Sequence, residues 1–138
     1  MKYFIAFRWR NKDKAQELSE KLKQKVGQEN VYCCLENQYS FHLVEKDAEE
    51  TMKDFESIKD WKNDDFVKNI FRTDLVELKK ANVVILLLPA GKSAHREIGI
   101  AYGLDKRCIL IGEVTETESL YLIFDEFYND IDDFMNSL

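Results

Sequence analysis

The chain of 138 residues has the size of one ordinary domain, and its net charge of −6 excludes the basic surface on which nucleic-acid binders depend. Hydrophobic residues at 45% and charged residues at 33% exclude a disordered chain. Its three cysteines form no disulfide framework, and neither zinc-site spacing, a signal peptide nor a membrane span is visible. We expect a single cytoplasmic domain, residues 1–138, with no metal, no cofactor, no membrane contact and no nucleic-acid polymer as partner.

The first 35 residues have the pattern of a strand, a helix and a second strand. Lys2–Phe7 is apolar and predicts a strand. Apolar residues at spacings of three and four predict a helix over Lys14–Val26, with Asp13 as its N-terminal cap and Gly27 as the glycine that ends it. Val31–Cys34 predicts a short second strand.

The stretch from Glu36 to Asp60 is dense in charge and has the weakest pattern. It contains a possible helix supported by four apolar residues, Val44, Ala48, Met52 and Phe55. A solvated helix explains this composition. So long an insertion in a small domain is also typical of a lid or a partner surface, and both interpretations stay open.

The second half of the chain continues the alternation. Asp64–Ala81 predicts a helix with one broad apolar stripe, and the uninterrupted apolar run Val83–Leu88 is typical of a central parallel strand. Ser93–Leu104 predicts a helix and Arg107–Ile111 another buried strand. The tail predicts a last strand or turn and a helix over Asp130–Leu138. Such alternation is typical of an α/β protein with helices on both faces of a parallel sheet.

Special backbone geometry is concentrated after one central strand, since Pro89 and four of the five glycines lie between residues 89 and 112. Ligands of open α/β sheets bind beyond the carboxyl ends of strands, and helix N-termini bind anions. The loop from Pro89 through Gly91 to Ser93 has this position. An ordinary turn with Ser93 as the helix cap is the alternative interpretation.

Two carboxylates occupy positions where the pattern is apolar. Glu97 lies one turn into its helix on the apolar side, where Ser93 could hydrogen-bond it, and Asp74 lies within the apolar stripe of Asp64–Ala81. Paired carboxylates in a cleft commonly perform glycosyl transfer. The structural alternatives are a glutamate that favours the helix dipole and an aspartate that caps a neighbouring loop.

Phe7, Arg8 and Trp9 follow the first strand at the same end of the sheet as Pro89. Their aromatic rings could stack on a base and the guanidinium could bind a phosphate. The alternative is a solvent-facing loop with its tryptophan packed on the domain. We expect His95 to be a surface histidine.

The segment Leu88–Arg107, LPAGKSAHREIGIAYGLDKR, resembles the nucleoside 2-deoxyribosyltransferase superfamily, in which a Gly/Ser-Ala turn precedes a Glu-hydrophobic-Gly helix. Asp74-Leu75, Lys80-Ala81-Asn82 and the apolar strand that follows fit the same pattern. The resemblance covers most of residues 1–8 and 64–112. It implies a flavodoxin-like three-layer α/β sandwich whose central, mostly parallel sheet has about five strands.

The resemblance also implies a function, namely cleavage or transfer at the N-glycosidic bond of a small-molecule nucleoside or nucleotide. Glu97 matches the nucleophile, Asp74 matches the aspartate that assists at the base, and Ser93 with Gly91 matches a phosphate-binding turn. A homo-oligomer, dimer or larger, is expected.

Ala90-Gly91-Lys92 replaces a loop aspartate that is usual in these transferases. The alternative function is therefore a non-catalytic nucleotide-binding module or a Toll/interleukin-receptor-like signalling and interaction module. Residues 36–60 would then form a partner surface.

Overall fold

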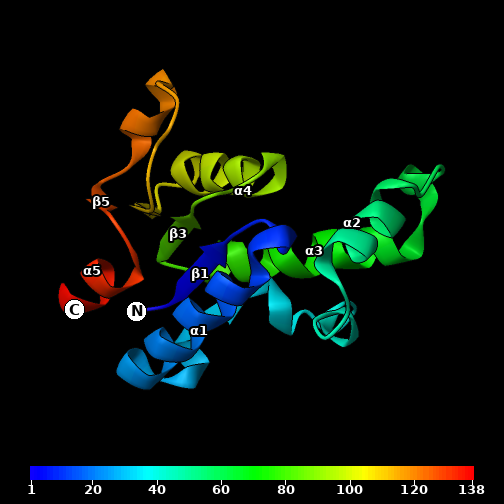
Figure 1. Cartoon of the computed structure of the whole chain (residues 1–138), viewed down its shortest axis with the longest axis horizontal. Helices are drawn as coiled ribbons and strands as arrows, with labels where there is room; N and C mark the ends of the chain where they lie inside the picture. The colour runs from blue at the N-terminus through cyan, green and yellow to red at the C-terminus, as the bar shows by residue number, and fades with distance from the viewer.

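A five-stranded, all-parallel sheet forms the centre of the protein in a computed structural model that describes all residues, 1–138 (Figure 1). Its strand order is β2-β1-β3-β4-β5, and each strand pairs in parallel with its neighbour. The strands are β1 (Tyr3–Ala6), β2 (Val31–Cys33), β3 (Val83–Leu87), β4 (Arg107–Ile111) and β5 (Glu126–Tyr128). The predicted flavodoxin-like α/β fold is confirmed.

Helices cover both faces of the sheet and complete the three layers (Figure 1). On one face, α1 (Lys12–Val26) and α5 (Ile131–Asn136) pack on one hydrophobic cluster. On the other face, α3 (Asp65–Lys80) and α4 (Lys92–Gly103) contribute to a second cluster. Every residue of β1 and β3 is buried, which is what a central parallel strand covered on both faces requires.

The charged insertion forms an arm, residues 38–64, that projects beyond the sheet beside the first half of α3 (Figure 1). It contains α2 (Ala48–Glu56), which begins where the Asp47 carboxylate accepts the backbone N–H of Glu50. No residue of α2 is buried, but Phe55 meets Phe66 edge to face with ring centroids 6.2 Å apart. The arm therefore rests on its neighbours without a core of its own.

Several predicted details are wrong at helix starts. Asp13 lies inside the first turn of α1 rather than at its cap, because the helix begins two residues earlier than predicted, at Lys12, and Asn11 takes the cap position. Gly91 takes the cap position of α4, so Ser93 lies within the helix and caps nothing. Gly27 does end α1, with φ of 100°.

The apolar stripe of α3 is only partly covered, because Leu78 is its one fully buried residue. The first half of this helix lies beyond the edge of the sheet and faces the arm instead of the core (Figure 1).

None of the helices combines the length and the hydrophobicity that a transmembrane span requires.

Candidate active site

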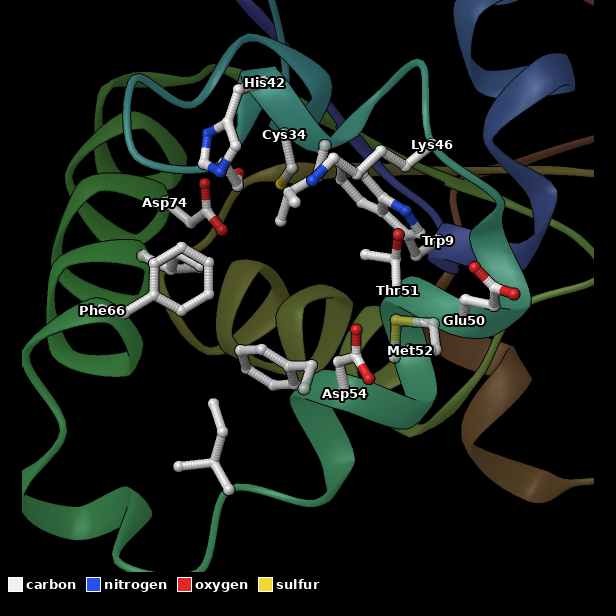
Figure 2. A pocket seen from close by; sticks show the side chains of 15 residues that line it. Trp9, Cys34, His42, Lys46, Glu50, Thr51, Met52, Asp54, Phe66 and Asp74 are labelled. Carbon is white, nitrogen blue, oxygen red and sulfur yellow. The ribbon is translucent and has the colours of Figure 1, made fainter.

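A cleft of about 590 Å³ opens between the arm, α3 and the residues that follow β1 and β2 (Figure 2). It lies at the carboxyl end of the sheet, beside the point where the strand order reverses between β1 and β3. Ligands of doubly wound sheets bind at this switch point. The lining residues are Trp9, Cys34, Ser40, His42, Leu43, Lys46, Glu50, Thr51, Met52, Asp54, Phe55, Ile58, Phe66, Ile70 and Asp74.

The fold brings the two predicted carboxylates together. A carboxylate oxygen of Asp74 on α3, one of Glu97 on α4 and the sulfur of Cys34 all lie within 4.8 Å of one another. Carboxyl groups about 5 Å apart are the arrangement of glycosidases that retain configuration through a covalent intermediate. We therefore treat Asp74 and Glu97 as a pair.

Asp74 is held by two hydrogen bonds to the same oxygen. The Tyr32 hydroxyl donates to Oδ1 at 2.8 Å, and the Asn37 amide donates to it at 2.9 Å. Burial raises the pKa of the Asp74 carboxyl, while the Asn37 and Tyr32 hydrogen bonds oppose this rise. Asn37 belongs to the loop after β2. Its hydrogen bond therefore also agrees with the alternative interpretation of Asp74 as an aspartate that caps a neighbouring loop.

Glu97 has a different environment from that of Asp74. Burial, with a further contribution from the negative charge of Asp74, raises the pKa of the Glu97 carboxyl to about 8. The expected hydrogen bond from Ser93 is not formed, because Ser93 is exposed. The Glu97 carboxyl is therefore protonated in most molecules at neutral pH.

The three residues after β1 have separate positions. Trp9 lines the cleft, and its indole N–H is buried without a hydrogen-bond partner (Figure 2). Phe7 is buried in the core, where its ring stacks on that of Trp9 at 6.4 Å and does not line the cleft. Arg8 lies beside Gly91, where a Cβ added to the glycine would be 3.8 Å from Cβ of Arg8. The loops after β1 and β3 thus meet as predicted, outside the main cleft.

His95, which we expected to be a surface histidine, is partly buried and lines a second cleft. Its Nδ1 is 2.7 Å from the carbonyl oxygen of Gly91, and its Nε2 is 2.9 Å from the Tyr121 hydroxyl. These bonds hold the ring in the wall of this cleft of about 760 Å³, which Pro89 also lines.

Sequence reasoning missed the contribution of the segment after β2. Tyr32 and Asn37 bind Asp74, while His42 and Lys46 point into the cleft from the arm (Figure 2). The available signal was position, because Cys34 and the residues after it leave a parallel strand at its carboxyl end.

Comparison with known proteins supports the fold. No model of a protein family matches the sequence, and no curated protein matches it. A solved structure does match, with a TM-score of 0.66 and 20% identity over 99% of this chain and 91% of the other. That structure is a 2-deoxyribosyltransferase from the psychrotolerant bacterium Bacillus psychrosaccharolyticus, a biocatalyst for the synthesis of antiviral and antitumoral nucleosides.

The chain has the fold of a 2-deoxyribosyltransferase. The predicted resemblance to the nucleoside 2-deoxyribosyltransferase superfamily is thereby confirmed at the level of the fold. The match extends over almost the whole chain.

Proposed function

We propose that the protein cleaves or transfers at the N-glycosidic bond of a small-molecule nucleoside or nucleotide, with Glu97 as nucleophile and Asp74 as its partner at the base. The observation that supports this most directly is the pairing of the two carboxylates within 4.8 Å beside a cleft. The separation favours a double displacement, in which Glu97 attacks C1′ and a covalent glycosyl ester forms.

The remaining predicted residues have distinct roles in this proposal. Trp9 stacks on the base from the wall of the cleft, and Phe7 supports its ring from below. A base or sugar that enters the cleft would also offer acceptors to the buried indole N–H of Trp9, which has no partner. Gly91 and Ser93, at the start of α4, bind the sugar or a phosphate together with Arg8, which lies beside Gly91.

We further propose a homo-oligomer, dimer or larger. The outer surfaces of α3 and α4 expose large apolar side chains, which are uncommon on a monomer when they gather on neighbouring helices. On α3, Phe71 is 61% exposed and Val76 50%, and on α4 Ile100 is 41% exposed and Tyr102 54%. A second copy packed on this surface would cover them.

A cytoplasmic location is the simplest proposal for a chain whose three cysteines, Cys33, Cys34 and Cys108, are all free. Such thiols persist in a reducing compartment. Fractionation of cells that express the protein would test this.

The decisive experiment incubates purified protein with a panel of nucleosides, nucleoside monophosphates and NAD, and follows the free base by chromatography. We expect base release that Glu97→Ala and Asp74→Asn abolish and that the matched surface variant Glu20→Gln leaves intact. Intact-protein mass spectrometry under turnover should show the mass of one glycosyl group, absent in Glu97→Ala, and a chelator should change nothing.

Ligand binding without base release, at high protein concentration and with every compound, would contradict catalysis. It would favour a non-catalytic nucleotide-binding module.

A further inference from the structure

The two carboxylates of the site receive unequal support from their neighbours. Oδ1 of Asp74 accepts hydrogen bonds from Tyr32 at 2.8 Å and from Asn37 at 2.9 Å. No donor of the protein reaches the Glu97 carboxylate, which experiences burial and the charge of Asp74. Hydrogen bonds to a carboxylate favour its charged form, and burial without them favours the neutral acid.

Both donors to Asp74 are fixed in place and cannot easily lose their protons. Asn37 is 1% exposed, and its Oδ1 accepts the backbone N–H of Tyr39, which turns the NH₂ group toward Asp74. The Tyr32 ring packs against Phe4 with centroids 5.6 Å apart. Burial raises the pKa of the Tyr32 phenol far above its usual range, so the hydroxyl remains a donor.

Other titratable groups near the pair do not reverse this asymmetry. The Cys34 thiol follows β2, and burial keeps it protonated by raising its pKa. Glu77, on the same helix as Asp74, adds a like charge that raises the pKa of Asp74. His42 and Lys46 line the cleft from the arm, and neither forms a hydrogen bond with either carboxylate.

We propose that Tyr32 and Asn37 are positioning residues that hold Asp74 as the anion and so place the single proton of the carboxyl pair on Glu97 in the resting protein. This inference rests on the proposed function for its consequence, and on the hydrogen bonds alone for the location of the proton. Two carboxylates this close share one proton, because the second charge would form beside the first.

The consequence is a closed proton balance for the first half of the reaction. As the C1′–N bond breaks, its electron pair goes to the base nitrogen, and the proton that Glu97 held reaches this nitrogen through Asp74. The oxygen of Glu97 freed of that proton forms the bond to C1′. The products are a glycosyl ester on Glu97, an anionic Asp74 and a neutral base, with no proton taken from solvent.

The test is a carboxyl ¹³C NMR titration of the labelled full chain, with Asp74 and Glu97 assigned from Asp74→Asn and Glu97→Gln spectra. We expect Asp74 to ionise at lower pH than Glu97. Tyr32→Phe should raise the apparent pKa of Asp74 by roughly 1–2 units, since it removes one hydrogen bond to a charged group and keeps the ring. Tyr128→Phe is the matched control, because its hydroxyl binds Glu126 on β5; it should move neither titration.

An Asp74 that ionises above Glu97, or a Tyr32→Phe titration identical to that of the parent, would overturn the inference. The acidic limb of the pH profile of kcat/KM gives a separate measurement of the Asp74 ionisation. Tyr32→Phe should shift this limb to higher pH. If Asp74 and Glu97 titrate in the expected order but the protein releases no base from any compound, the proposed function is refuted. The location of the proton on Glu97 then still stands.

Discussion

Arg10, in the turn after β1, donates through Nε to the carboxylate of Glu49 on α2 at a distance of 2.8 Å. One of its terminal nitrogens also binds Glu56, at the other end of the same helix, at 2.9 Å. A single side chain thus connects the sheet to both ends of the helix that forms one wall of the cleft. The Nζ of Lys12 adds bonds to the backbone carbonyls of Val44 and Lys46.

Arg10→Ala should weaken substrate binding more than it slows chemistry, because α2 contacts the cleft but none of the reacting atoms. We expect KM to rise by roughly 3- to 10-fold and kcat to change little, because exposed ion pairs hold α2 only weakly. Steady-state kinetics at low and high salt measure this. Lys21→Ala, which removes a surface pair with Asp132 away from the cleft, is the control. A fall in kcat at constant KM would contradict the assignment.

Glu97 should make the stability of the protein depend on pH. Its pKa rises from 4.5 to about 8 on folding, so the folded state binds more protons than the unfolded state between these values. The resulting stabilisation is complete below pH 4.5 and is lost as the pH rises through about 8. Between pH 5 and pH 8, the free energy of unfolding measured with urea should fall in both proteins. The fall should be about 2–5 kcal/mol smaller in Glu97→Gln than in the parent. Equal losses in the two proteins would show that this carboxyl is not perturbed.

Trp9 should report ligand binding by its fluorescence. Trp61 is the other tryptophan and is 56% exposed on the arm, so Trp61→Phe leaves Trp9 as the one emitter. Addition of a nucleoside should change the emission of this variant, and Trp9→Ala should raise the dissociation constant roughly 10-fold through the loss of stacking. Unchanged emission at saturating substrate would place the base elsewhere.

Phe71→Lys should dissociate the oligomer, since it puts a charge on the exposed surface of α3. Light scattering after gel filtration gives the mass of each form. Phe127→Lys, at an aromatic residue on β5 that is 55% exposed, should leave the mass unchanged. A parent protein that is monomeric at tens of micromolar would refute the proposed assembly.

Gly112→Ala should destabilise the protein by ~1–3 kcal/mol. Gly112 has φ of 123°, and an added Cβ would lie 2.8 Å from Cβ of Leu88 and 3.3 Å from its carbonyl oxygen. Gly99→Ala is the matched control, because nothing lies within 4 Å of its added Cβ, and a mid-helix alanine should stabilise by about 0.5–1 kcal/mol. Thermal unfolding of both variants tests the pair.

What the sequence predicts depends on how local the determining interaction is. The strand Val83–Leu88 and the helix Asp64–Ala81 were predictable from local sequence. A fully covered strand and an amphipathic helix each have a characteristic pattern. The apolar pattern around Asp74 and Glu97 marked both carboxylates as anomalous, and the family resemblance gave each of them a role.

The hydrogen bond from Tyr32 to Asp74 joins residues 42 positions apart, and no local pattern predicts it. The same applies to the pair of Arg10 and Glu49, which are 39 positions apart. Two helices begin before the starts that the sequence predicts. Lys12 and Lys92 are the first residues of α1 and α4, so Asp13 and Ser93, which composition favours as caps, lie inside the helices.

The arm enters the chain between β2 and α3, and none of the residues of α2 is buried. The sheet and the two carboxylates would therefore tolerate a different segment grafted at residues 41–64, provided that the new wall offered acids for Arg10. Under the proposed function, the wall of the cleft and the carboxylate pair are in this way encoded in separable stretches of chain. Libraries confined to the graft would explore new bases while the catalytic scaffold stays untouched.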